Sequence, residues 1–387
     1  MTGPLREDVR REAEALEARG ELPTALATYT ALGASAPDDL DVLEATARLS
    51  AKLGHETSAL KALAHLAQVS VRTDDGWRGL YVARALSDPP VSLASATACV
   101  AEAMAHRAIE GDAAAQPLWA PLQRDALVQF LNATRLRTFE AGDVVVTEGD
   151  RGTSMFAIAD GQVQVCRERE GGGLSTVAQL GPGRVFGEVA LVSDAPRMAT
   201  VVARTTVRAL ELARADVLRV GWRHPPIVGA VERFCRERAL DYVASAGGPW
   251  AQLAPQLRRA ASDAFRWRAV PAGTEIIRQG DPNDALYLLV RGRCLPVLSH
   301  RQGGESSLPE MVEGDVFGEI SLLLRKPASA TVRAITSCAL LVLDRDVCLT
   351  ALESEKGVKH RLTQLAIERL QASAVVLARH GEPDGRV

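Results

Sequence analysis

Apolar residues follow two different spacings along the chain. Up to about residue 115 they recur every three or four positions, as at Val9, Ala13 and Leu16. That spacing places them on one face of a helix and predicts a helical N-terminal region. From residue 137 onward the apolar residues form short alternating runs, which are bounded by glycine-containing turns. These runs predict β-strands, and their even spacing favours a sandwich or jelly roll.

The helical region contains a weak repeat of 34 residues. Gly20 and Ala25 recur as Gly54 and Ala59. Glycine permits a tight turn between two helices, small alanines let the helices pack closely, and Pro37 ends the second helix. The run resembles a tetratricopeptide repeat, and the helical patterns that follow suggest a third copy. An ordinary helical bundle is the alternative.

The remainder of the chain repeats itself at a fixed offset of 131 residues. Residues 185–188 (Val-Phe-Gly-Glu) recur as 316–319, and residues 199–201 (Ala-Thr-Val) recur as 330–332. No gap is needed, so the two copies predict two domains of the same fold. We therefore expect a multidomain α+β chain with flanking helices at 118–133, 226–246 and 356–379. Its three predicted parts are a helical module at 1–115, a first β domain at 116–246 and a second at 247–387.

One segment of the first copy carries candidate chemistry. Gly187 allows a close backbone approach, and residues 187–193 predict a short helical turn whose free N–H groups can bind an anion. Arg197 follows nine residues after Glu188 and can present a two-point donor to a phosphate. Glu188 accepts hydrogen bonds, so it suits a sugar hydroxyl. These residues predict a pocket for a ligand with one phosphate and one nearby hydroxyl.

At this segment the chain resembles the cyclic nucleotide-binding domain family, over roughly residues 118–246 and again 250–380. The resemblance implies a β jelly roll in which Arg197 holds the cyclic phosphate and Glu188 accepts from the ribose 2′-hydroxyl. Met198 stands where guanosine-preferring members often have threonine, which favours cyclic AMP over cyclic GMP. The alternative is a jelly roll with an empty pocket. The predicted ligand-binding residues are Phe186, Gly187, Glu188, Val189, Ala190, Arg197, Met198 and Ala199.

The second copy lacks the phosphate arginine, because Ala328 occupies the position of Arg197. Loss of the charged partner of a buried phosphate costs about 2–5 kcal/mol, or about thirtyfold to several-thousandfold in affinity. Arg325 and Lys326 precede the gap, where a solvated turn is expected. This copy is therefore a degenerate site or a structural or docking domain. Its candidate residues are Gly318, Glu319, Ser321, Ala328 and Ser329.

Composition narrows the class of protein. A net charge of −3 and a pI near 6.2 argue against a nucleic-acid binder. The six cysteines form no C-x-x-C pair and match no zinc spacing, so no metal is expected. The charged N-terminus and the absence of a long apolar run predict a cytoplasmic protein without membrane insertion. Alanine richness and only five lysines suggest a GC-rich, bacterial genome.

No catalytic domain is recognisable, so we expect a regulatory protein rather than an enzyme. Tandem copies resemble the regulatory subunit of cyclic AMP-dependent protein kinase, although that protein's dimerisation segment and inhibitor site are not recognisable here. The working hypothesis is an adaptor in which cyclic AMP in the first β domain changes how the helical module binds a protein partner. The alternative is a constitutive protein-interaction scaffold with nucleotide-free jelly rolls.

Overall fold

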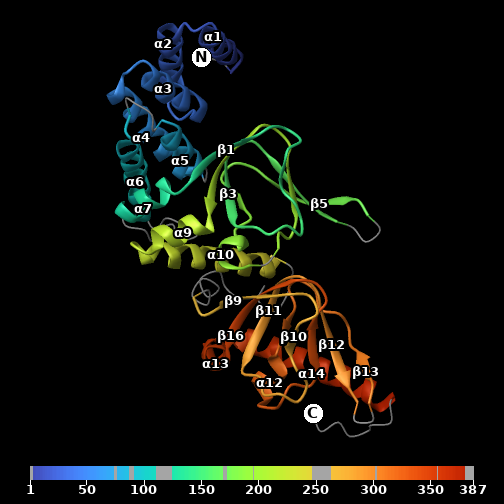
Figure 1. The fold of residues 1–387 in the computed structure, drawn as a ribbon. Helices are drawn as coiled ribbons and strands as arrows, with labels where there is room; N and C mark the ends of the chain where they lie inside the picture. Colours follow the sequence, from blue (N-terminus) through green and yellow to red (C-terminus); the bar gives the residue numbers. More distant parts are fainter. Residues whose placement is uncertain are drawn as a thin grey trace. The chain divides into compact units, whose positions relative to one another are not determined.

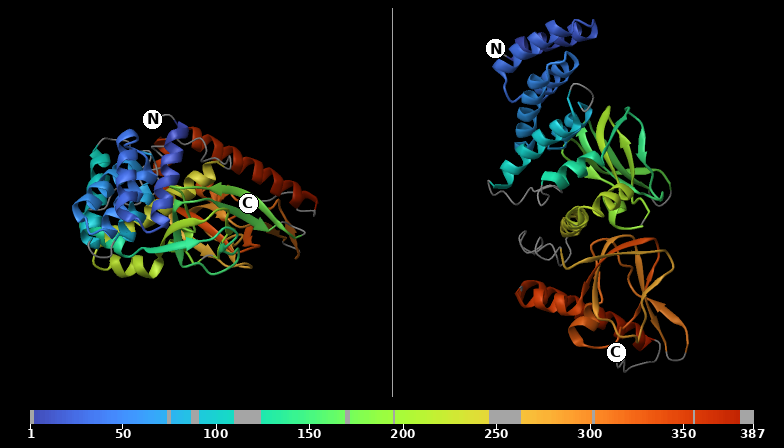
Figure 2. Two further views of the ribbon diagram at one scale, coloured as in Figure 1. Left: turned by 90° about the horizontal axis from the view of Figure 1, so that it is seen from above. Right: turned by 60° about the vertical axis from the view of Figure 1, so that its left-hand side comes forward.

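We describe the protein from a computed structural model. The description covers residues 3–73, 76–86, 91–109, 124–168, 172–194, 196–245, 263–300, 303–354 and 356–379. The chain divides into two compact units, of which one comprises Met1–Leu191 and Ala199–Ala230. The other comprises Val192–Met198 and Val231–Val387. Figure 1 labels the elements along the chain, and Figure 2 shows them from two further sides.

The N-terminal region is helical, as predicted. Its apolar stripes meet in a core that includes Ala13, Ala25, Leu32 and Leu49, each at most 1% exposed. The helices, coloured blue to teal in Figure 1, are α1 (Gly3–Ala18), α2 (Leu22–Ser35), α3 (Leu40–Lys52), α4 (Glu56–Arg72), α5 (Gly76–Ala85) and α6 (Leu93–Ile109).

Two helix pairs of this region share one turn geometry at the predicted spacing of 34 residues. Gly20 between α1 and α2 has φ +79°, and Gly54 between α3 and α4 has φ +78°. After each glycine the next N–H donates back into the preceding helix, from Glu21 to Leu16 at 2.9 Å and from His55 to Ser50 at 2.8 Å. Glycine tolerates this left-handed backbone, which explains why it stands at both turns.

The first β domain is a sandwich of two antiparallel four-stranded sheets. The sheets have the orders β1-β8-β3-β6 and β2-β7-β4-β5, and their inner faces share an apolar core. The strands are β1 (Arg135–Phe139), β2 (Val144–Val146), β3 (Ser154–Asp160), β4 (Val163–Glu168), β5 (Leu174–Leu180), β6 (Val185–Phe186), β7 (Thr200–Ala203) and β8 (Val207–Ala213). The helices are α7 (Arg124–Asn132), α8 (Val189–Val192), α9 (Arg214–Gly221) and α10 (Pro225–Ser245).

The second β domain repeats this topology, with sheet orders β14-β11-β16-β9 and β10-β15-β12-β13. Phe265, Leu288 and Leu341 lie in its core and are at most 1% exposed. Its strands are β9 (Arg266–Val270), β10 (Glu275–Ile277), β11 (Ala285–Arg291), β12 (Cys294–Ser299), β13 (Glu305–Ser307), β14 (Val316–Phe317), β15 (Thr331–Ala334) and β16 (Cys338–Asp344). Its helices are α12 (Glu319–Leu324), α13 (Arg345–Ser354) and α14 (Lys356–Arg379).

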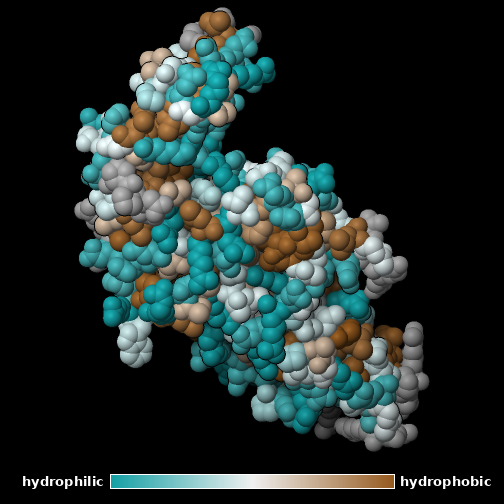
Figure 3. Space-filling view, turned by 45° about the horizontal axis from the view of Figure 1, so that its top comes forward, coloured by the Kyte–Doolittle hydropathy of each residue, from teal (hydrophilic) through white to brown (hydrophobic). Residues whose placement is uncertain are grey.

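The predicted flanking helices appear as α7, α10 and α14. Residues 118–123 of the first predicted helix lie outside the described residues. Hydrophilic residues cover most of the face shown in Figure 3, where smaller apolar patches interrupt them. No helix in the part of the chain that the structure describes is both long and apolar enough to cross a membrane.

Candidate functional site

The segment after β6 is anchored to the sheet by an aromatic pair. Phe186 lies opposite Phe156 of β3, and the two rings stack with centroids 5.2 Å apart. The chain then turns at Gly187, whose φ of +75° favours glycine. The short helix α8 follows, and Arg214 holds it by donating from Nε to the carbonyl oxygen of Ala190 at 2.7 Å. Gly187, Glu188 and α8 are thereby fixed at the end of β6.

The second copy builds the same arrangement. Tyr287 and Phe317 stack with centroids 5.0 Å apart, and Gly318 has φ +88°. A Cβ atom on Gly318 would lie 2.5 Å from the carbonyl oxygen of Ala285, so a side chain does not fit. Arg345 takes the place of Arg214 and donates from Nη2 to the carbonyl oxygen of Leu322 at 2.9 Å. The two copies therefore share a local scaffold as well as a sequence motif.

The predicted residues of the first copy fall into two short stretches around α8. Val189 and Ala190 lie on the helix, and Glu188 precedes it and is half-buried. Arg197 and Met198 are half-buried in the segment 192–198, and Ala199 directly precedes β7. The N–H of Ala190 donates to the carbonyl oxygen of Gly187 at 3.1 Å. This donor belongs to the turn itself, so the expectation of outward-facing free N–H groups fails at Ala190.

In the second β domain the predicted residues lie together around a cavity of about 290 Å³. Gly318, Glu319, Ser321, Ala328 and Ser329 all line it. Further lining residues come from the opposite sheet and from α14. They include Ile277, Leu308, Met311, Val332, Arg369 and Ser373.

Ala328 stands on the wall of this cavity and is 7% exposed. Its N–H donates to the carbonyl oxygen of Asp281, and its own carbonyl accepts from the N–H of Gly280, both at 2.9 Å. The loop is thus fixed in place, and it presents a methyl group where the first copy has a guanidinium. Arg325 and Lys326 are exposed and do not line the cavity. This placement matches the solvated turn expected for them.

The sequence motif gave no signal for Arg369, which lies 50 residues beyond Glu319 on α14. Its Nη1 donates to Oε1 of Glu319 at 3.1 Å and also contacts the carbonyl oxygen of Val316. Glu319 is only 1% exposed. Burial raises the pKa of the Glu319 carboxyl above its ordinary value, although the charge of Arg369 opposes that shift. Helical spacing alone could not reveal this contact, because it depends on where α14 packs.

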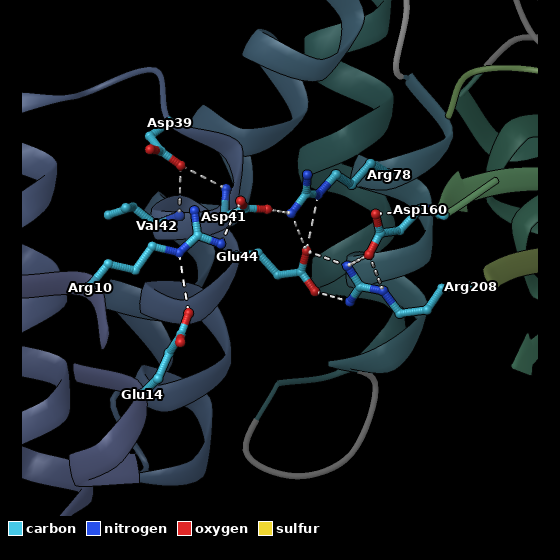
Figure 4. Close-up of polar contacts among 10 residues, drawn as sticks. Arg10, Glu14, Asp39, Asp41, Val42, Glu44, Arg78, Asp160 and Arg208 are labelled. Atoms are coloured by element: carbon cyan, nitrogen blue, oxygen red, sulfur yellow. Dashed lines mark hydrogen bonds and ion pairs between the residues drawn. The ribbon is translucent and has the colours of Figure 1, made fainter. Parts of the chain in front are cut away.

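A second group of charges joins the helical module to the first β domain (Figure 4). Arg208 of β8 donates to both carboxylate oxygens of Glu44 on α3 and also to Asp160 of β3, at 3.0 Å from Nη2. Glu44 accepts in addition from Nε of Arg78 on α5 at 3.0 Å. The Arg208 guanidinium lies over the ring of Tyr81, 5.4 Å from its centroid. We call Glu44, Arg78, Asp160 and Arg208 the Arg208 cluster.

The electrostatics of the Arg208 cluster favour its charged form. Glu44 is 8% exposed, and three hydrogen-bond donors from two arginines face it. Burial alone would lower the pKa of Arg208, but hydrogen bonding and attraction from Glu44 and Asp160 raise it. The cluster is therefore a paired set of charges within one compact unit. Among the residues that the structure describes, no group of His, Cys, Asp and Glu could hold a metal ion.

Comparison with known proteins identifies the β domains. The cyclic nucleotide-binding domain profile matches residues 136–222 and 267–355. The chain therefore contains two cyclic nucleotide-binding domains in tandem, preceded by a helical region. These matches include most of the strands of each sandwich and both segments that carry the repeated Phe-Gly-Glu motif.

The most similar relatives are regulatory subunits of cAMP-dependent protein kinase. The subunit from Emericella nidulans is 32% identical over 233 residues, which are 57% of this chain and 52% of that protein. The Dictyostelium discoideum subunit is 31% identical over 210 residues, which are 54% of this chain and 62% of that protein. The chain thus spans about half the length of the curated relatives it matches. These relatives do not support the bacterial origin suggested by composition.

Among solved structures, the chain is similar to the regulatory domain of Toxoplasma gondii PKA, crystallised with cAMP. The sequence identity is 26%, and the alignment covers 65% of this chain and 92% of that chain. The TM-score is 0.34.

Proposed function

We propose that the protein is a cyclic AMP sensor that regulates a protein partner, with the nucleotide held in the first β domain. The observation that carries this proposal is the contrast between the two copies. Both share the glycine turn and the glutamate, but only the first retains an arginine at the phosphate position, Arg197 against Ala328. The names of the curated relatives support the choice of cyclic AMP.

Each predicted residue has a role in this proposal. Arg197 pairs with the cyclic phosphate, to which its planar guanidinium can donate two parallel hydrogen bonds. Glu188 accepts from the ribose 2′-hydroxyl, and Gly187 lets the sugar approach the backbone. The backbone from Val189 to Ala190 shapes the turn that faces the phosphate. Phe186, Met198 and Ala199 complete the wall.

The first β domain also offers a route from the nucleotide site to the helical module. Strand β3 pairs with β6 at Phe156 and Phe186, next to Gly187. Four residues further along β3, Asp160 bonds to Arg208, which in turn bonds to Glu44 of the helical module. A ligand that favours one arrangement of this strand would favour one arrangement of the Arg208 cluster. A coupling of about 1–3 kcal/mol would change partner affinity about five- to 150-fold.

The partner class follows from the relatives, which are regulatory subunits of a protein kinase. We propose a protein kinase catalytic subunit as the partner. The competing function is a constitutive scaffold that binds no nucleotide, and Ala328 favours it for the second domain.

Calorimetry of the full chain with cyclic AMP and cyclic GMP distinguishes these functions. The sensor binds cyclic AMP more tightly, whereas the scaffold gives no heat and no thermal shift with either nucleotide. A cyclic AMP-dependent change in inhibition of a kinase catalytic subunit would then support the partner assignment, and capture that ignores the nucleotide would contradict it.

A further inference from the structure

We propose that the cavity of the second β domain binds an uncharged, hydroxyl-bearing heterocycle of nucleoside size and excludes cyclic nucleotides. This assignment concerns a different domain from the proposed cyclic AMP site and does not depend on it. It rests on the shape of the cavity, the charges that line it and the loss of one guanidinium at Ala328.

The cavity has the features of a formed ligand site. Its volume of about 290 Å³ lies at the lower end of the range of small-molecule pockets, roughly 300–1,000 Å³. Ile277, Met311 and Phe317 give it an apolar wall. Buried hydroxyls of Ser321 and Ser329 interrupt that wall at the cassette, where they are 3% and 9% exposed. An apolar body with a few polar contacts fits such a lining.

The charges of the lining oppose an anionic ligand. Arg369 is the one cation among the cavity-lining residues described, and four carboxylates accompany it. Its charge is already opposed by Glu319 at 3.1 Å and by Asp315 at 3.9 Å. A phosphate in this cavity would meet an excess of negative charge at short range, which disfavours its binding. The carboxylates are Glu310, Asp315, Glu319 and Glu368.

The pair of Arg369 and Glu319 instead suits a neutral hydroxyl. A hydroxyl group can donate to a carboxylate oxygen and accept from a guanidinium N–H at the same time. Glu319 and Gly318 keep the positions that their counterparts occupy in the first copy, and the phosphate position has lost its charge. Removing the guanidinium from the wall corresponds to removing the phosphate from the ligand. A purine ribonucleoside is a natural ligand class that remains after that subtraction.

The test uses the full chain carrying Arg197→Ala, which removes the predicted phosphate partner of the first site. Adenosine, guanosine and cyclic AMP are titrated into this variant by calorimetry, with thermal unfolding as a second readout. We expect at least one nucleoside to bind once per chain, and to bind at least tenfold more tightly than cyclic AMP. No heat and no thermal shift with either nucleoside, or equal affinity for cyclic AMP, would overturn the proposal.

A second substitution locates the ligand. Ala328→Leu, added to Arg197→Ala, fills part of the cavity and should weaken nucleoside binding at least tenfold, whereas Arg325→Ala lies outside the cavity and should not. Hydrogen exchange of the Arg197→Ala chain checks the location without altering the cavity. Protection by the nucleoside is expected within 316–332. Unchanged binding in the Ala328→Leu variant, or protection confined to 185–201, would contradict the assignment. Failure of cyclic AMP binding in the unmodified chain would affect only the first-domain proposal.

Discussion

Arg208 of strand β8 and Glu44 of helix α3 are 164 residues apart in the sequence and form a two-point ion pair, with Nη2 and Oε2 3.1 Å apart. The pair joins the helical module to the first cyclic nucleotide-binding domain (Figure 4). Arg78 and Asp160 complete its hydrogen bonding. Charges taken out of water contribute to specificity when each is satisfied in this way, so the cluster defines how these two parts fit together.

Arg208→Leu should destabilise the first unit by about 2–3 kcal/mol, because it leaves the buried Glu44 with one arginine partner fewer. This value is below the range for fully buried pairs because the Arg208 side chain is 27% exposed. Urea unfolding of the full chain measures the loss. The control is Arg137→Leu, which removes an arginine that is 51% exposed and lies 3.5 Å from Glu211. It should cost less than about 1 kcal/mol. Equal losses would show that the Arg208 cluster is no more important than a surface pair.

Nucleotide binding should be felt in the helical module if β3 and the Arg208 cluster connect them. Hydrogen exchange with and without cyclic AMP should change at residues 140–205 and also in α3 and α5. The Arg208→Leu variant should keep the first change and lose the second. Exchange changes confined to 140–205 in the unmodified chain would mean that the first domain binds nucleotide passively.

Glycine substitutions should separate backbone strain from crowding in the second cassette. Gly273 and Gly318 both have positive φ, but an added Cβ meets nothing within 4 Å at Gly273 and a carbonyl oxygen at 2.5 Å at Gly318. Gly273→Ala should cost about 1–2 kcal/mol from the left-handed backbone alone. Gly318→Ala should cost about 1–3 kcal/mol more, since the crowding is added to the strain. Thermal unfolding compares the two variants, and similar melting temperatures would contradict the tight fit of the cassette turn.

Acid should weaken the helical module through the pair of Glu17 and Arg48. The hydrogen bond from Arg48 lowers the pKa of the Glu17 carboxyl below its model value of 4.5, and burial opposes this only in part. Between the folded and unfolded pKa values the unfolded chain binds more protons, so stability is present above about pH 4.5 and falls as pH falls through the lower folded value. Thermal unfolding at pH 6 and pH 3.5 should therefore differ less in Glu17→Gln than in the unmodified chain. The same difference in both proteins would argue that this pair does not contribute.

The sequence predicted the elements better than the contacts between them. Spacing of apolar residues and recurring glycines indicated the helices, the strands and the duplicated β domain, because these patterns depend on local geometry. Gly20 and Gly54 show this directly, since each turn requires a positive φ that glycine tolerates. The pairing of Arg208 with Glu44 had no such signal, because surface charges are common and their partners depend on the packed fold.

The candidate sites divide in the same way. Glu319 and Ala328 were identified from their places in a repeated motif. Arg369 was not, although it supplies the guanidinium that contacts Glu319, because it arrives from a helix outside the motif. A free donor was expected at Ala190, and the turn uses that donor internally. Side-chain chemistry within a motif was therefore more predictable than the use of its backbone groups.

The most direct test of the central claim is a calorimetric titration of cyclic AMP into the unmodified chain and into the Arg197→Ala variant. One tight site per chain is predicted for the unmodified protein, because Ala328 leaves the second phosphate position uncharged. Arg197→Ala should weaken that site at least tenfold, as expected when a phosphate loses its charged partner. Absence of binding in the unmodified chain, two equal tight sites, or an affinity unaffected by Arg197→Ala would contradict the account.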